Sequence, residues 1–271
     1  MLKLSILFFI LFECLLMYSQ NLVLNPSFEE YSYLPQLYSK KDTFFCKNWN
    51  TYNINAADYF HTQSKDSMHS VPNNIDGFHL AHTGQAYVGI IAFNWQGYIE
   101  YVTGTLSEPL KEGKIYKVSY YTQYAGKISK FYISVLGAYF TKKSNFFYLA
   151  ESDPFFKEML KPDIKAHIKN NENNFLNNDS TWILISGNYK AKGGEKYITI
   201  GVFYEDNFNL NLSDQLRNVP LSKKKRDKLY FKNQEILKLN PNFKECKYFE
   251  DFPGDAYYFI DDVSVEEVKD K

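Results

Sequence analysis

One stretch near the start of the chain decides the fold: Asn21-Leu22-Val23-Leu24-Asn25-Pro26-Ser27-Phe28-Glu29. Its Asn25-Pro26 dipeptide marks a turn, and apolar side chains surround that turn. A carboxylate, Glu29, follows directly after an aromatic ring. We predict that this stretch forms the first strand and corner of a β-sandwich. Its expected partner is the last strand, over residues 257–265.

An apolar leader precedes this stretch. A lysine at position 3 is followed by a mainly apolar run from Leu4 to Met17. Such a run is typical of a secretory signal peptide and is short for a membrane span. We expect residues 1–19 to be removed on export, leaving no transmembrane span in a secreted, periplasmic or cell-surface protein. A lipoprotein is disfavoured, because Glu13 stands before Cys14 where a lipid-attachment box requires a small residue.

The composition favours strands and one domain. The 23 Tyr and 23 Phe residues, with runs of Val, Ile and Thr, are typical of a β-rich chain. The roughly 250 residues after the leader suffice for one domain with its own core. The 31 basic and 31 acidic residues balance, so the charge gives no bias toward nucleic acid.

Alternation and turn residues place the strands. Residues 114–122 alternate with period two, with Tyr116, Val118 and Tyr120 on one face. We predict an all-β sandwich over residues 20–268, interrupted by insertions at 141–180 and 205–255. Both insertions are expected to be partly helical, the first over 154–167 and the second, before the last strand, over 227–239. Strands are expected within 57–61, 84–91, 98–102, 114–122, 131–140, 181–189, 196–203 and 257–265.

The second insertion is basic. Between Arg217 and Lys247 the chain carries ten Lys or Arg residues against three acids. The simpler interpretation is an exposed insertion whose charge complements the acidic end of the chain. The alternative is a basic patch for an anionic glycan or a lipopolysaccharide phosphate.

Two end motifs carry a family resemblance. The stretch 21–29 resembles the opening of galactose-binding-like jelly rolls, which include several families of carbohydrate-binding modules. Their last strand often ends in a motif like Tyr258-Phe259-Ile260-Asp261-Asp262-Val263-Ser264-Val265. The chain also resembles a bacterial envelope domain that is often found N-terminal to OmpA-like peptidoglycan-binding domains. The matching motifs include Trp49, Asp58-Tyr59-Phe60, Val71-Pro72-Asn73-Asn74, Gly84-x-Ala86-Tyr87-Val88-Gly89-Ile90, Glu100-Tyr101, Gly137-Ala138-Tyr139-Phe140, Trp182-x-x-Ile185-Ser186-Gly187 and Gly193-Gly194-Glu195-Lys196-Tyr197.

The resemblance implies a jelly-roll domain that binds without catalysis, with a glycan or cell-envelope polysaccharide as its expected partner. A structural or adhesion protein that binds another protein is the alternative. A glycoside hydrolase or lyase is a third possibility, since such enzymes use two carboxyl groups at a set separation. The carboxylates available are Glu29, Asp58, Glu100 and Glu195, and no local signature pairs any two of them.

Three carboxylates are candidate metal ligands. Asp261 precedes Val263 and Val265 by period two, so we expect it on their inward face, near Glu29 of the opening stretch. Oxygen ligands from two chain ends suit calcium, which comparable jelly rolls often hold there, with Asp262 as the alternative ligand. A carboxylate that only accepts hydrogen bonds is the other interpretation.

Two cysteines remain after the leader, Cys46 and Cys246. Export permits a disulfide between them, and two free thiols are the alternative. The histidines His61, His69, His79 and His82 fall close together in the sequence, but without a zinc-motif spacing. We interpret these histidines as scattered surface residues rather than a zinc site.

Aromatic side chains are the candidate sugar contacts: Trp49, Trp95, Tyr98 and Tyr101. Trp95 is preferred because residues 92–97 look like a loop, whereas Trp182 lies in an apolar strand and is expected to be buried. The alternative is that all three tryptophans pack in the core or at its rim.

Overall fold

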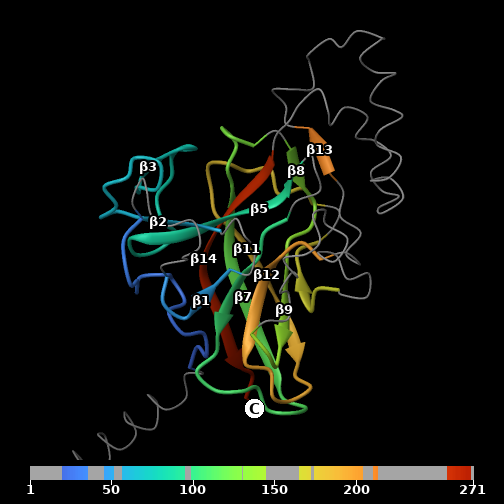
Figure 1. The fold of residues 1–271 in the computed structure, drawn as a ribbon. Helices are drawn as coiled ribbons and strands as arrows, with labels where there is room; N and C mark the ends of the chain where they lie inside the picture. Colours follow the sequence, from blue (N-terminus) through green and yellow to red (C-terminus); the bar gives the residue numbers. More distant parts are fainter. Residues whose placement is uncertain are drawn as a thin grey trace, which may run out of the picture.

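Two five-stranded antiparallel sheets form the domain (Figure 1). The computed structural model describes residues 20–35, 46–51, 57–94, 99–129, 131–144, 165–171, 174–203, 210–212 and 255–269. The first sheet has the order β1 (Trp49–Asn50), β6 (Val102–Thr105), β12 (Tyr197–Gly201), β9 (Gly137–Thr141) and β10 (Ile168–Lys169). The second sheet has the order β11 (Ile183–Lys190), β7 (Ile115–Tyr124), β14 (Asp255–Glu267), β5 (Ala86–Asn94) and β2 (Asp58–His61).

Two short strand pairs complete the described structure. β3 (Asn73–Asn74) pairs with β4 (Gly77–Phe78), and β8 (Phe131–Ile133) pairs with β13 (Leu210–Leu212). Figure 1 shows these two pairs well apart, with β8 and β13 on the opposite side of the domain from β3. The predicted all-β sandwich of antiparallel sheets is therefore confirmed.

Several sequence predictions change in detail. The strand expected over 131–140 is two strands, since β8 pairs outside the two large sheets while β9 joins the first sheet. β10 and β13 lie inside the stretches predicted as insertions. The described part of the chain contains no helix: of the helix expected over 154–167 it includes only residues 165–167, which are not helical, and the helix expected over 227–239 falls outside it. The leader also falls outside it, and no apolar helix of membrane-spanning length occurs among the described residues.

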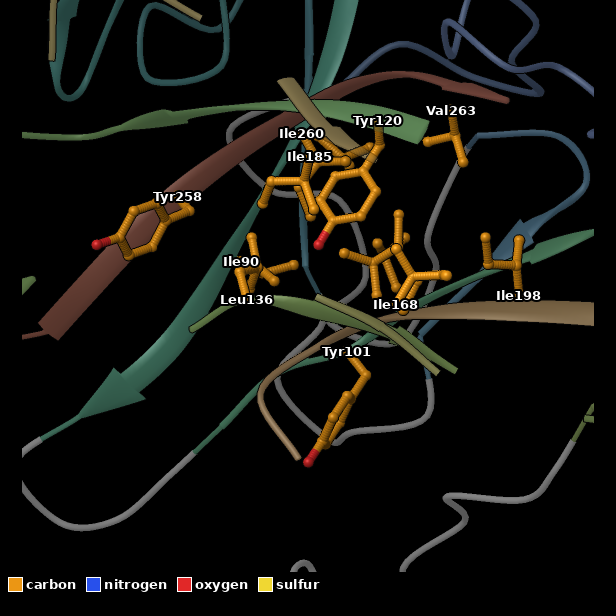
Figure 2. Close-up of a cluster of buried hydrophobic side chains, with 14 of the residues drawn as sticks. Ile90, Tyr101, Tyr120, Leu136, Ile168, Ile185, Ile198, Tyr258, Ile260 and Val263 are labelled. Carbon is orange, nitrogen blue, oxygen red and sulfur yellow. The ribbon is translucent and has the colours of Figure 1, made fainter. Parts of the chain in front are cut away.

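The core lies between the two large sheets. In β7, Tyr116, Val118 and Tyr120 are buried while Ile115 is exposed, which confirms the predicted alternation. Figure 2 shows Tyr120, Ile185 and Ile260 of the second sheet gathered near Ile90 and Leu136. Burial of such side chains contributes about 1.5–3 kcal/mol each, so this layer dominates the stability of the domain.

The opening stretch is a connection between the sheets rather than a strand. Leu22 N donates to Val265 O of β14 at 2.8 Å, and Ser107 N donates to Leu22 O at 2.7 Å. Val23 forms an isolated bridge with Leu106, just after β6. The prediction that this stretch lies beside the last strand is confirmed, whereas the prediction that it is itself a strand is wrong. Asn25 and Phe28 both have positive φ, 54° and 61°, which breaks an extended conformation.

A β-bulge divides the last strand. Between Asp261 and Ser264 the pairing of β14 with β7 shifts by one residue, and Asp262 has φ 47°. Ile260 and Val263 therefore both lie in the main core, although they are three residues apart (Figure 2). The extra residue in a bulge changes which side chains face inward.

A second, smaller apolar cluster lies on the other face of the second sheet. Phe60 and Tyr87 stack there, and Phe259 meets both rings edge-to-face, with ring centroids 4.9–5.3 Å apart. Val71 packs against these rings, and Val71 belongs to residues 62–84, which we call the cover segment. The cover segment includes β3 and β4 and covers this face of the sheet, so it gives the domain a second layer of packing.

Candidate functional site

Asp261 joins the last strand to the end of the cover segment. Its Oδ2 accepts hydrogen bonds from the backbone N–H groups of His82, at 2.8 Å, and Thr83, at 3.3 Å. Its Oδ1 accepts from the N–H of Asp262 at 2.7 Å. Burial, together with the neighbouring Asp262 carboxylate, raises the pKa of Asp261 to about 8. The expectation that Asp261 shares the face of Val263 and Val265 is wrong, because the bulge separates them.

Asp262 holds the same junction from the other side. Its Oδ1 accepts from the hydroxyls of Ser27, at 2.5 Å, and Thr83, at 2.6 Å, and its Oδ2 contacts His82 Nδ1. Burial opposes ionisation, but the hydrogen bonds from His82, Ser27 and Thr83 outweigh it and lower the pKa of Asp262. The His82 ring stacks on Tyr121 with centroids 3.6 Å apart.

Glu29 lies against the turn that follows the cover segment. Its Oε1 accepts from the backbone N–H groups of Gln85, at 2.7 Å, and Ala86, at 3.1 Å. Gly84 has φ +65°, and a Cβ at that position would come 2.3 Å from Glu29 Oε1. The chain therefore needs glycine there both for its backbone conformation and for the space that Glu29 occupies.

These three carboxylates converge on residues 82–86, as expected for chain ends that meet. Their oxygens, however, face N–H and O–H donors, and a calcium ion at Glu29, Asp261 and Asp262 would have to replace those donors. Among the described residues, no group of three or more His, Cys, Asp or Glu side chains is arranged to hold a metal. Calcium at these carboxylates stays a prediction.

Cys46 is buried beside the opening stretch. Asn25 Nδ2 lies 3.2 Å from its Sγ, and desolvation by burial strongly raises the pKa of the thiol. Its expected partner, Cys246, lies outside the described residues, so the disulfide also stays a prediction.

Two of the predicted sugar contacts are core residues. Trp49 is 2% exposed, its Nε1 donates to Asn25 O at 2.8 Å, and its ring packs on Phe28 with centroids 4.6 Å apart. Tyr101 is 4% exposed and its hydroxyl donates to Val202 O at 2.7 Å. Neither ring offers a face to a ligand, which corrects the prediction for both. Trp95 and Tyr98 lie outside the described residues.

An open cleft lies on the side of the second sheet that carries the cover segment. Its volume is about 550 Å³. One wall comes from the β3–β4 hairpin and the residues after it, and the other from the turn after β7 and the segment before β11. The lining residues are Asp76, Phe78, His79, Leu80, Ala81, Gln123, Gly126, Lys127, Asp179, Ser180 and Trp182.

Trp182 is the tryptophan that reaches this surface. It is partly exposed, and its Nε1 donates to Leu80 O at 3.1 Å. The indole packs edge-on against Tyr87, with ring centroids 5.8 Å apart. Phe78 of β4 lines the same cleft, and its side chain is 66% exposed. The expectation that Trp182 is buried is wrong, because Trp182 shares the parity of Leu184 and Ser186, which are exposed positions of β11.

Gln123 lies in the floor of the cleft. It pairs with Phe259 in the second sheet and is 5% exposed. Its Nε2 donates to Asp179 O at 2.6 Å, which fixes the orientation of the amide. Its buried Oε1 has no hydrogen-bond partner among the described residues.

Asp76 and His79 form a buried pair in the same floor. Asp76 Oδ1 accepts from Ile128 N at 2.8 Å, and Asp76 Oδ2 lies 2.6 Å from His79 Nε2. The other ring nitrogen, His79 Nδ1, is buried and has no hydrogen-bond partner in the described part of the chain. The prediction of scattered surface histidines is wrong, since His61 and His79 are buried and His69, His79 and His82 each contact an aspartate.

A second polar network fastens the cover segment at its other end. His69 Nδ1 lies 2.7 Å from Asp66 Oδ2, and His69 Nε2 lies 3.3 Å from Asp58 Oδ1. Tyr257 donates to Asp58 Oδ2 at 2.5 Å. Two carboxylates, one at each ring nitrogen, favour the imidazolium form of His69.

The carboxylates considered for catalysis do not meet in the cleft. Glu100 Oε2 accepts from Ile91 N at 2.8 Å, and Glu195 Oε1 accepts from Tyr189 at 2.7 Å. Asp58 and Glu29 serve the two networks that hold the ends of the cover segment. Each of the four therefore has a structural role in the described part of the chain.

Comparison with known proteins gives structural neighbours only. No family model matches the chain, and no curated protein matches it. One similar solved structure is a xylan-binding domain, CBM22-1 of Xyn10C from Paenibacillus barcinonensis, with TM-score 0.38, 11% identity, and coverage of 94% of this chain and 99% of that one. Another is the K2 cleaved adhesin domain of Lys-gingipain, with TM-score 0.39, 11% identity and coverage of 91% and 99%. A third is the Stig cyclase Fisc from Fischerella sp. TAU, with TM-score 0.40, 10% identity and coverage of 93% and 100%.

The similar solved structures include carbohydrate-binding modules. At TM-scores of 0.40 and below they decide nothing about a ligand. The fold is assigned from the strand pairing of this chain, and the cleft is its candidate ligand site.

Proposed function

We propose that this chain is a non-catalytic, exported glycan-binding module whose ligand lies in the cleft between the cover segment and Trp182. The observation that carries the proposal is the pair of accessible aromatic rings, Trp182 and Phe78, above a floor of buried polar groups. Sugar rings stack their apolar faces on aromatic rings, while polar side chains form hydrogen bonds with the sugar hydroxyl groups. The resemblance to galactose-binding-like jelly rolls supports the same class of ligand.

A glycan array probed with the purified protein tests this proposal. Trp182→Ala and Phe78→Ala should each weaken binding by about tenfold or more, because each substitution removes an aromatic contact. Tyr33→Ala is the matched control, since Tyr33 is 69% exposed and does not line the cleft. Circular dichroism of each variant confirms that it is folded. An array without signal, or equal losses for Tyr33→Ala and Trp182→Ala, would contradict the proposal.

A protein partner is the second candidate, and one observation favours it. Four large apolar side chains of the cover segment are exposed: Met68, Ile75, Phe78 and Leu80. Exposed apolar groups that gather in one segment often mark an interaction surface. Met68→Ser together with Ile75→Ser distinguishes the candidates, because neither residue lines the cleft. A glycan-binding module keeps its glycan affinity after these substitutions, whereas an adhesion protein loses its partner.

A further inference from the structure

In the floor of the cleft, several buried hydrogen-bonding atoms have no partner among the described residues. Gln123 Oε1 is an acceptor, because the amide nitrogen already donates to Asp179 O. Asp76 Oδ2 is a second buried acceptor without a hydrogen-bond partner among the described residues, and it lies 2.6 Å from His79 Nε2. A buried acceptor without a partner is costly, so a ligand that donates hydrogen bonds is favoured at this floor.

The charges around the floor have the same preference. Asp76 is buried beneath the cleft, and Asp179 lies at its edge with an exposed side chain. A Cβ on Gly126 would come 2.7 Å from Asp179 Oδ2, so the absence of a side chain at 126 leaves room for this carboxylate. Among the described lining residues the one lysine is Lys127, which is exposed and whose stem lies near Gly77. A cation is therefore favoured at the floor over an anion.

The aromatic rings above the floor also suit a cation. Trp182 and Phe78 both line the cleft, and aromatic rings attract ammonium groups as well as the apolar faces of sugars. An ammonium group offers three donors and no acceptor, which complements the free acceptor Gln123 Oε1 and the carboxylates of this floor.

From these observations we infer that the cleft takes a sugar residue that carries a free amino group, held by Gln123 and Asp179. This inference rests on the proposed function, because it names the class of glycan for the same site. It predicts discrimination against N-acetylated sugars, whose amide is uncharged and larger, and against uronic acids, whose carboxylate would face Asp76 and Asp179.

Three hexasaccharides test the inference by isothermal titration calorimetry. Chitosan hexaose, chitin hexaose and cellohexaose share one backbone and differ at C2, where they carry an amine, an N-acetyl group and a hydroxyl. At a pH that keeps the amine protonated, chitosan hexaose should bind about tenfold or more tightly than the other two, since hydrogen bonds from charged groups are the stronger ones. The preference should weaken as salt is added.

Two variants in the cleft should change this preference in opposite directions. Asp179→Asn should weaken chitosan hexaose about tenfold and leave cellohexaose unchanged, while Lys127→Met should strengthen chitosan hexaose. Glu108→Gln is the matched control, because Glu108 is an exposed carboxylate outside the cleft. Failure to bind chitosan hexaose, or binding no tighter than cellohexaose, overturns the inference. If cellohexaose then binds and Trp182→Ala abolishes its binding, the proposed function stands without it.

Discussion

Asp261 Oδ2, on the last strand, lies 2.8 Å from the backbone nitrogen of His82, 179 positions earlier in the chain. Two further N–H groups donate to the same carboxylate, which is fully buried. Asp261→Ala leaves these donors without an acceptor, so we expect a loss of about 3 kcal/mol in the free energy of unfolding. Glu108→Ala, at an exposed carboxylate, should stay within about 0.5 kcal/mol of the parent in the same urea titration. Equal effects would mean that this junction does not hold the cover segment.

Gly84→Ala should be more destabilising than Gly113→Ala. Both glycines have positive φ, +65° and +76°, so both substitutions carry the backbone cost of roughly 1–2 kcal/mol for a left-handed residue. Only the Cβ at position 84 would collide with Glu29, since nothing lies within 4 Å of a Cβ at 113. The difference between the two melting temperatures measures the contact of Glu29 with the turn. Equal shifts would show that Glu29 moves aside freely.

Stability should fall as the pH rises through the pKa of His69. Burial opposes the charged form, but the hydrogen bonds to Asp58 and Asp66 outweigh it and raise the pKa above the ordinary 6.5. The stabilisation is therefore complete below pH 6.5 and is lost as the pH passes the raised value. Across this range the unfolding free energy should change less with pH in His69→Gln than in the parent. An unchanged slope would contradict the pairing.

The raised pKa of Asp261 should add a second pH dependence of stability, which begins at a lower pH than that of His69. Its pKa rises from 3.8 to about 8 on folding, so the folded state keeps a proton that the unfolded state releases. Stability due to this group should therefore decrease between about pH 4 and pH 8. In Asp261→Asn this contribution is removed, and the difference in unfolding free energy between parent and variant should depend on pH. A constant difference would place the pKa of Asp261 near its ordinary value.

Calcium at Glu29, Asp261 and Asp262 is tested by melting the protein with calcium and with a chelator. An ion that binds only the folded state must raise the melting temperature. We expect the rise to disappear in Asp262→Asn, which removes one charge from the three carboxylates. A melting temperature that ignores both calcium and chelator would show that the hydrogen bonds of the junction suffice without an ion.

The strands were predictable where one face of a sheet is buried and the other is not. β7 shows this plainly, because Tyr116, Val118 and Tyr120 alternate with residues that lie closer to solvent. The face of Asp261 was not predictable, since a bulge leaves no mark in the period-two pattern. Nor was the cleft, because Phe78, Gln123 and Trp182 come from three separate segments that only the folded chain brings together. Trp49 and Trp182 exchanged their expected roles for the same reason: burial depends on neighbours far away in the sequence.

The bulge in β14 also limits how this domain can be altered. Before the bulge the strand serves both layers, with Tyr257 and Phe259 beneath the cover segment and Tyr258 and Ile260 between the sheets, and after the bulge Val263 and Val265 continue the layer between the sheets. Deleting Asp262 would only remove the extra residue and leave Val263 and Val265 facing inward, whereas deleting Val263 would exchange the faces beyond the bulge, so that Ser264 faced inward and Val265 outward. A change in loop length within residues 62–84 should be tolerated far better than a change in the number of residues in β14. An engineer who wishes to give the cleft a new ligand should vary the cover segment and leave the count of residues in the last strand untouched.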